Sequence, residues 1–210
     1  MNLKDFFHNG YLNGLYQSTD KDRGHDYITA YYNDKLSKHK FDKISILEIG
    51  IYKFDSIKLF RDFFVNAKII GVDSFPQLWD DSINDYVYIP NVSKYSSHFI
   101  DSYSSTILDN CEIYMMNAYS EEVLNKIEDN SIDFIIEDGS HRIEDQLYVV
   151  ENWTKKLKTG GTLIIEDIQD INHSSKLIEL ANKVDCESRI IDLRSNMVSY
   201  DNILFEVIKK

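Results

Sequence analysis

The chain has 210 residues, of which 23 are Lys or Arg and 35 are Asp or Glu, for a net charge of −12 at pH 7. Hydrophobic residues make up 43% of the sequence, which is enough for a packed core and excludes a chain that is disordered by composition. The lysines are scattered and form no basic stripe of the kind found in duplex-binding domains, so we expect no nucleic-acid partner.

The length fits one domain, and we expect residues 1–210 to form it. The N-terminus lacks an apolar core of signal-peptide length, and no run approaches membrane-spanning length, so we expect no membrane partner. Cys111 and Cys186 do not have the spacing of a metal motif and are expected to be free thiols in a reducing compartment. Together these features predict a cytoplasmic protein.

The first part of the chain, residues 1–43, is predicted to be a small N-terminal helical segment. Within it, residues 26–39 carry aromatic and aliphatic side chains three or four positions apart, which is helix spacing. A polar turn, residues 18–24, precedes this predicted helix. We expect the segment to be a partly exposed appendage of the single domain.

Beyond residue 43 the pattern changes to short apolar runs that alternate with stretches of helical spacing. The predicted strands are 44–49, 67–72, 112–116, 132–137 and 163–165, and the predicted helices are 56–64, 120–127, 141–157 and 174–184. Two further runs, 189–193 and 203–208, predict a closing hairpin. Because alternating strands and helices form parallel sheets with right-handed crossovers, we expect an α/β fold: a Rossmann-like, doubly wound, mostly parallel sheet with a C-terminal antiparallel hairpin strand.

Residues 74–110 interrupt this alternation with a long stretch that is rich in tyrosine. A long connection without regular elements is usually functional or partly disordered. We expect this insertion to form a lid over a site or a contact between subunits, with a peripheral helix pair that buries the aromatic side chains as an equal alternative. A homo-oligomer is one outcome that the sequence leaves open.

The most informative pattern is a pair of apolar strands that each end in acidic residues. One strand leads into Asp138 and, three residues later, His141, and the other leads into Glu166 and Asp167. If the two strands are parallel neighbours, all four side chains emerge at the sheet edge where open α/β sheets bind ligands. Three carboxylates suit Mg²⁺ better than Zn²⁺, and an imidazole beside the ion can act as a general base. Helix capping is the alternative role for the two aspartates.

A second group of residues lies at the ends of the first two predicted strands. Glu48 lies two residues before Gly50, and Asp73 ends the next strand. Glycine lets the backbone approach a ligand closely, and an acidic residue at the end of the second strand commonly bonds a ribose hydroxyl. The three-glycine phosphate fingerprint is absent from the sequence. The group therefore predicts a site for an adenosine-bearing ligand without a required pyrophosphate, although Asp73 as a helix cap is an alternative.

These motifs resemble those of class I S-adenosylmethionine-dependent methyltransferases. More narrowly, they are similar to the metal-dependent sugar O-methyltransferases of macrolide biosynthesis, the mycinamicin and macrocin type. The resemblance covers most of the chain. It rests on Ser18-Thr19-Asp20-Lys21, Leu47-Glu48-Ile49-Gly50, Gly71-Val72-Asp73, Asp138-Gly139-Ser140-His141, and Gly160-Gly161 followed by Ile165-Glu166-Asp167.

The resemblance implies two ligands, S-adenosylmethionine and Mg²⁺. The residues that it places at the cofactor are Glu48, Gly50, Asp73, Asn117 and Lys21. The residues that it places at the metal ion are Asp138, Glu166 and Asp167. It further implies that His141 is the general base and that His141 and Asp138 are the catalytic residues.

Two departures from the family pattern concern the cofactor. Met116-Asn117-Ala118 replaces a Gly-Asp-Gln-like run near the adenine, and Asn117 keeps hydrogen-bonding capacity but carries no charge. Tyr52-Lys53-Phe54-Asp55 replaces a glycine-rich turn after Gly50.

The function expected from the sequence is Mg²⁺-dependent methyl transfer from S-adenosylmethionine to a hydroxyl of a sugar or glycoconjugate, so that the partner is a small molecule or a sugar. One alternative is a catechol-type O-methyltransferase, which an apolar, aromatic-walled acceptor pocket would favour over a polar one. Another is a non-catalytic nucleotide-binding subunit, which the altered turn after Gly50 favours.

Overall fold

The computed structural model describes residues 1–74, 77–80, 85–88, 111–196 and 199–210, and its centre is a seven-stranded sheet. The strands are β1 (Ser45–Ile49), β2 (Lys68–Asp73), β5 (Cys111–Met115), β6 (Ile132–Glu137), β7 (Leu157–Ile165), β8 (Cys186–Asp192) and β9 (Ile203–Lys209). They lie in the order β5-β2-β1-β6-β7-β9-β8. The five strands from β5 to β7 are parallel, and β9 runs antiparallel to both of its neighbours. The predicted mostly parallel sheet with a C-terminal antiparallel hairpin strand is therefore confirmed.

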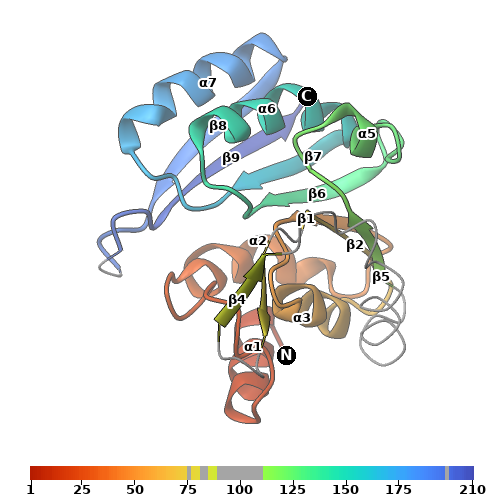
Figure 1. Cartoon of the computed structure of the whole chain (residues 1–210), viewed down its shortest axis with the longest axis vertical. Coiled ribbons are helices and arrows are strands. Elements are labelled where there is room, and N and C mark those ends of the chain that lie inside the picture. Colours follow the sequence, from red (N-terminus) through yellow and green to blue (C-terminus); the bar gives the residue numbers. More distant parts are fainter. Residues whose placement is uncertain (75–76, 81–84, 89–110, 197–198) are drawn as a thin grey trace.

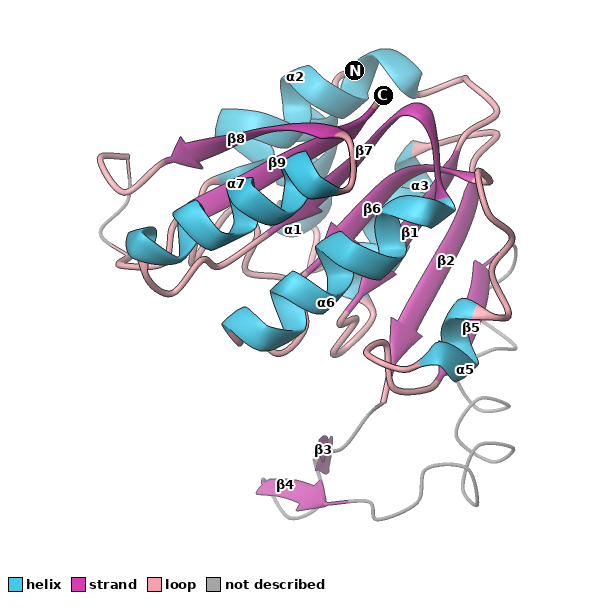
Figure 2. Ribbon diagram, turned by 90° about the horizontal axis from the view of Figure 1, so that it is seen from above, coloured by secondary structure: helices cyan, strands magenta, loops and turns pink. Residues whose placement is uncertain are grey.

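Helices cover both faces of this sheet (Figure 1 and Figure 2). One face carries α5 (Glu121–Leu124), α6 (Ile143–Trp153) and α7 (Ser174–Lys183), and the other carries α1 (Leu3–Leu12), α2 (Asn33–Leu36) and α3 (Asp55–Phe63). Shorter turns of helix lie at Ile28–Tyr32, which is π-helical, and at Ser37–His39, Thr154–Lys156 and Ile171–His173, which are 3₁₀. None of the described helices has the length and apolar character that crossing a bilayer requires.

The strands divide their side chains between two hydrophobic cores because successive residues of a strand point to opposite faces of the sheet. Ile46 and Ile136 belong to the core under α1 and α3, whereas Leu47 and Ile135 belong to the core under α6 and α7. Most side chains of such strands are apolar, which is why the sequence shows them as hydrophobic runs.

The N-terminal segment is helical and partly exposed, as predicted, and its buried side chains belong to the first core. Phe7, Tyr32 and Leu36 are 0 to 1% exposed and pack in one cluster with Phe60 of α3. The helix predicted over 26–39 is present as three short pieces of different pitch. α3 connects β1 to β2 and packs on this face of the sheet. The N-terminal segment packs on the same face and adds further side chains to this core.

Several element boundaries differ from those predicted. β8 starts at Cys186, three residues earlier than expected, because it pairs with β9 along its whole length. β7 starts at Leu157, six residues before the predicted strand at 163–165. In the Tyr-rich insertion the structure describes an antiparallel pair, β3 (Gln77–Asp80) and β4 (Asp85–Tyr88). The predicted lid, subunit contact or helix pair at 74–110 falls mostly outside the described residues.

Candidate active site

Five parallel strands end at one edge of the sheet and bring the predicted motifs together. Glu137, the last residue of β6, lies opposite Ile165, the last residue of β7. The next residues, Asp138 and Glu166, therefore leave neighbouring strands side by side, and the Glu166 N–H donates to the Glu137 carbonyl over 2.9 Å. The two strands are parallel neighbours, as the sequence analysis expected.

A pocket of about 550 Å³ opens at this edge, between the turn at residues 18–20 and the loops that follow β1, β2, β5 and β6. The predicted site residues that line it are Gly50, Asp73, Asn117, Asp138, His141 and Asp167. The three other predicted site residues are buried, at 0 to 1% exposure: Lys21, Glu48 and Glu166. The predicted residues thus form two sets: six line the pocket, and three are buried, namely two carboxylates and the Lys21 ammonium.

Gly50 lets the loops after β1 and β6 meet. Its φ of +80° is left-handed, and a Cβ at this position would lie 2.0 Å from the carbonyl oxygen of Asp138. The Gly50 N–H also donates to the carbonyl of Val72 over 2.9 Å. No residue with a side chain fits here, because both the backbone conformation and the contact distance exclude a Cβ.

Asp73 holds the turn that replaces the family's glycine-rich sequence. Its Oδ2 accepts hydrogen bonds from the backbone N–H groups of Ile51 at 2.9 Å and Tyr52 at 3.2 Å. Tyr52 and Phe54 have φ values of 37° and 67°, so this turn takes the left-handed conformations that glycine would favour. The altered sequence therefore still forms a tight turn at the pocket wall.

Two residues that the sequence analysis missed, Tyr119 and Glu137, connect the loop after β5 with the loop that carries His141. The Tyr119 hydroxyl donates to Glu137 Oε1 and accepts from the Ser140 N–H, both over 2.9 Å. Burial raises the pKa of Glu137 to about 7, although the hydrogen bond from Tyr119 opposes this. Asn117 joins the same group, because its Oδ1 accepts from the Tyr119 N–H over 3.0 Å. Glu137 was detectable as the first of two carboxylates at a strand end.

Lys21 places its ammonium among the buried carboxylates. Its Nζ lies 2.7 Å from Asp138 Oδ2, 2.8 Å from both oxygens of Glu166 and 3.2 Å from Glu48 Oε1. The Tyr32 hydroxyl also donates to Glu166. Burial by itself lowers the pKa of Lys21, but the three carboxylates outweigh it and hold the pKa well above its usual value.

The carboxylates of this edge carry more negative charge than Lys21 can compensate. Burial raises the pKa of Asp138 to about 7 and that of Glu166 well above its ordinary value, and the Asp167 charge adds to both effects. Lys21 opposes the shift in each case. In such a group of acids the protonated forms are favoured, and a further cation would stabilise the ionised carboxylates.

His141 and Asp167 are paired where the same group lines the pocket. His141 Nδ1 lies 3.1 Å from Asp167 Oδ2, and its Nε2 lies 4.0 Å from Asp138 Oδ1. Burial lowers the pKa of His141, but the hydrogen bond and charge of Asp167, with the charge of Asp138, raise it to about 9. Both His141 and Asp167 are left-handed, with φ of 57° and 54°, a strain that clusters at functional sites.

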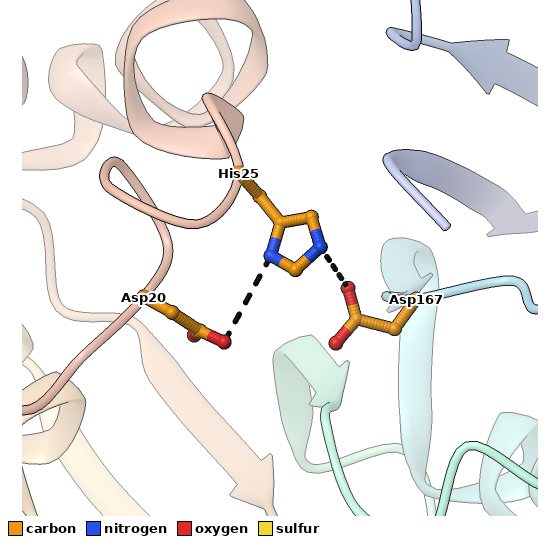
Figure 3. A group of neighbouring side chains, drawn as sticks. All are labelled: Asp20, His25 and Asp167. Atoms are coloured by element: carbon orange, nitrogen blue, oxygen red, sulfur yellow. Dashed lines mark ion pairs between the residues drawn. The ribbon is translucent and has the colours of Figure 1, made fainter. Parts of the chain in front are cut away.

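His25 is a second imidazole at Asp167, which sequence analysis did not identify (Figure 3). Its Nε2 lies 3.4 Å from Asp167 Oδ1 and 3.2 Å from Asp201 Oδ1, and its Nδ1 lies 3.8 Å from Asp20 Oδ2. The ring stacks on Tyr27, whose hydroxyl donates to Asp167 Oδ1 over 2.7 Å. Asp167 is thus held between the two histidines. The spacing of His25 from the acidic motifs gives no signal of this contact.

The donor groups fit a divalent cation that prefers oxygen. Ligand atoms of Asp138, His141 and Asp167 lie within 4.8 Å of one another, as do those of Asp20, His25 and Asp167. An ion with Mg–O distances of about 2.1 Å places opposite ligands about 4.2 Å apart. All three residues of the first set line the pocket, whereas His25 of the second set (Figure 3) is not among the lining residues. The first set therefore fits better.

Residues 47–168 match a family model described as a methyltransferase domain. This range contains every predicted site residue except Lys21. No curated protein sequence matches the chain.

Solved structures of methyltransferases share the fold. The MycE methyltransferase of the mycinamycin biosynthetic pathway, in complex with Mg and SAH, has a TM-score of 0.62 and 16% identity over 100% of this chain and 55% of its own. The fibrillarin pre-rRNA processing protein of Methanococcus jannaschii has a TM-score of 0.55 and 15% identity over 81% of this chain and 68% of its own. A putative rRNA methylase from Clostridium thermocellum has a TM-score of 0.54 and 15% identity over 91% and 96%. The chain spans about half the length of MycE.

Proposed function

The chain belongs to the family of methyltransferase domains, and from this premise we propose that it transfers a methyl group from S-adenosylmethionine to a hydroxyl of a sugar or glycoconjugate. We propose further that the reaction depends on Mg²⁺ and uses His141 as the general base. The observation that carries this proposal is the convergence of Asp138, Asp167 and His141 on the pocket that Gly50 and Asp73 also line. The MycE complex with Mg, SAH and mycinamycin VI supports the same combination of ligands.

The proposed cofactor site is the part of the pocket between Gly50, Asp73 and Asn117. S-adenosylmethionine, when bound, supplies a methyl group on a positively charged sulfur. The backbone at Gly50 allows close approach, and the Asp73 carboxylate suits a ribose hydroxyl. Glu48 and Lys21 support this site from the interior. Glu48 accepts a hydrogen bond over 2.7 Å from Ser56, which lines the pocket, and Lys21 directly follows residues 18–20, which also line it.

The proposed metal ligands are Asp138, Glu166 and Asp167. A bound Mg²⁺ supplies Lewis-acid polarisation that lowers the pKa of an acceptor hydroxyl. Asp138 and Asp167 face the pocket, whereas Glu166 lies behind them against Lys21. Asp167 is fixed by three donors or ring contacts, from Tyr27, His25 and His141, so its carboxylate is held in one orientation before any ligand arrives.

The proposed base acts at one nitrogen of His141. In the proposed tautomer the proton is on Nδ1, which lies 3.1 Å from Asp167 Oδ2, and Nε2 takes the proton of the acceptor hydroxyl. A carboxylate that holds an imidazole in this way fixes its tautomer and stabilises the charged ring. The neighbouring carboxylates raise the pKa of His141 to about 9, so without a metal ion the imidazole keeps a proton at neutral pH. A cation bound beside it would lower this pKa.

The surroundings of Asp167 favour a polyhydroxylated acceptor over a phenolic diol. Gln169 donates to Asp201 Oδ2 over 3.2 Å, and the Tyr200 hydroxyl donates to Gln169 Oε1 over 2.7 Å. In the pocket itself, Ser18, Thr19, Asp20 and Ser140 add donors and acceptors suited to sugar hydroxyls. A small-molecule or sugar acceptor also agrees better than a nucleic acid with the net charge of −12.

A screen for methyl uptake tests the proposal. The protein is incubated with methyl-labelled S-adenosylmethionine and a panel of nucleotide sugars, glycan fragments and catechols, in Mg²⁺ or in excess EDTA. We expect label in a sugar-bearing acceptor with Mg²⁺ and none with EDTA. Label only in catechols would contradict the assigned acceptor class, and equal label in EDTA would contradict the metal requirement.

A further inference from the structure

Lys21 holds its ammonium inside the protein, at 0% exposure, against carboxylates from β1 and from the ends of β6 and β7. We propose that Lys21 is a resident counter-cation of the acidic site, which a divalent ion has to displace from Asp138 and Glu166. Lys21 therefore lowers the affinity of the site for the ion. This inference rests on the metal site of the proposed function and concerns the role of the chain's own lysine there.

Glu166 is the ligand that Lys21 blocks. Both of its oxygens lie 2.8 Å from the Lys21 ammonium, and the Tyr32 hydroxyl donates to Oε1. The Glu166 side chain is 1% exposed, so solvent hardly touches it. An ion that binds between the two oxygens at about 2.1 Å needs the space that the ammonium fills.

Asp138 is the point at which an ion and the lysine compete. Its side chain is 18% exposed and lines the pocket, and its Oδ2 lies 2.7 Å from the Lys21 ammonium. An ion that arrives from the pocket therefore meets Asp138 and Asp167 first. It gains Glu166 as a third carboxylate ligand only when Lys21 leaves.

Glu48 gives the displaced ammonium another partner. Its Oε1 is buried, lies 3.2 Å from the Lys21 Nζ and has no hydrogen-bond donor among the described residues. Its Oε2 accepts from the Ser56 hydroxyl over 2.7 Å, which fixes the carboxylate. Lys21 can thus exchange Asp138 and Glu166 for a full hydrogen bond to Glu48 while its charge stays paired inside the protein.

The displacement has a cost that removal of the lysine abolishes. In the wild type an arriving ion breaks charge-assisted hydrogen bonds at Asp138 and Glu166 and meets a like charge a few ångströms away. Without Lys21 no ammonium occupies the oxygens of these carboxylates, so an ion reaches them without displacing a charge. The ion-free site is then less stable, and the site binds an ion more tightly.

Calorimetric titration with Mn²⁺, which replaces Mg²⁺ at oxygen sites, tests the inference on wild type, Lys21→Met and Lys35→Met. Lys35 is the matched control, because its ammonium pairs over 2.8 Å with Glu206, another buried carboxylate, outside the pocket. We expect Lys21→Met to bind Mn²⁺ at least about tenfold more tightly than wild type, and Lys35→Met to bind as wild type does. In thermal unfolding, Mn²⁺ should raise the midpoint more in Lys21→Met than in the other two proteins.

Equal or weaker Mn²⁺ binding by Lys21→Met overturns the inference but leaves the metal site standing, provided that wild type binds. If neither wild type nor the variants bind Mn²⁺, the proposed metal site fails, and the inference fails with it. Should Lys21→Met be unfolded without ions, Mn²⁺-induced recovery of its circular dichroism supports the inference. The affinity for Mn²⁺ is then measured on Lys21→Gln, whose amide still donates to a carboxylate but carries no charge.

Discussion

His141 is the residue on which the proposed chemistry depends most directly. Because its Nε2 is the proposed proton acceptor, His141→Ala should lower methyl transfer by about 100-fold or more. Cofactor affinity should stay unchanged, since the proposed cofactor contacts come from the loops after β1, β2 and β5. Initial rates and calorimetry with S-adenosylmethionine measure the two effects. His173→Ala is the control, because His173 follows β7, the strand next to β6, and does not line the pocket. Wild-type rates in His141→Ala would remove His141 as the base.

Individual site residues could be predicted where they follow a strand, and not where tertiary packing brings them in. Asp138 and Glu166 directly follow apolar runs, so the rule that ligands bind at the carboxyl edge of parallel strands locates them. Lys21 bonds Asp138 across 117 positions of sequence, and His25 reaches Asp167 from the same N-terminal turn. Neither contact has a local pattern, because it depends on how the N-terminal segment packs over the edge. The resemblance pointed to Lys21 but not to its burial.

At the scale of elements, the junction of the β1 and β6 loops makes a sharp prediction. Gly50→Ala should lower the free energy of unfolding by more than about 3 kcal/mol, because it adds a left-handed strain and a clash with the Asp138 carbonyl. Gly160→Ala is the matched control, since Gly160 has a similar φ of +77° but nothing within 4 Å of the added Cβ. It should cost only about 1 kcal/mol. Urea unfolding measures both, and equal losses would disprove the clash.

The alternation of strands and helices was predictable because each parallel strand is buried on both faces and reads as a continuous apolar run. That β6 and β7 end side by side follows from this alternation, because strands joined by one helix are usually parallel neighbours. The three-part helix over residues 28–39 does not, because an aromatic pattern at helix spacing does not distinguish π, α and 3₁₀ pitch. The full length of β8 also escaped prediction, since it is set by pairing with β9.

At the scale of the whole molecule, stability should depend on pH through Glu206, which joins β9 to β8 and to the N-terminal segment. Burial acts to raise the pKa of Glu206, but hydrogen bonds from Arg189, Lys35 and Tyr31 outweigh burial and lower it. The folded protein therefore binds this proton less readily than the unfolded chain does. The resulting stabilisation is complete above the unfolded pKa of about 4.3 and is lost as the pH falls through the folded value.

Glu206→Gln should accordingly lower the free energy of unfolding at pH 7 by about 1–3 kcal/mol. It should also show a smaller further loss than wild type when the pH falls from 7 to 3. Denaturant unfolding at a series of pH values measures both. Parallel curves for the two proteins would contradict the assigned pKa direction.

The site as a whole is assembled from both ends of the chain. The N-terminal turn supplies Lys21 and His25, the central strands supply Asp138 and Asp167, and the C-terminal hairpin loop supplies Asp201, which lies 3.2 Å from His25. Residues 47–168, the part that matches the methyltransferase family, therefore lack Lys21, His25 and Asp201. Activity should require the whole described chain.

The central claim is that one pocket binds S-adenosylmethionine and, beside it, a divalent ion at the acidic ends of β6 and β7. The most direct test is calorimetry in which S-adenosylmethionine is titrated first and Mg²⁺ second, with wild type and with the double variant Asp138→Asn, Asp167→Asn. We predict that both proteins bind the cofactor and that only wild type then binds Mg²⁺, one ion per chain. The account is contradicted if wild type binds no S-adenosylmethionine, or if the double variant binds Mg²⁺ as wild type does.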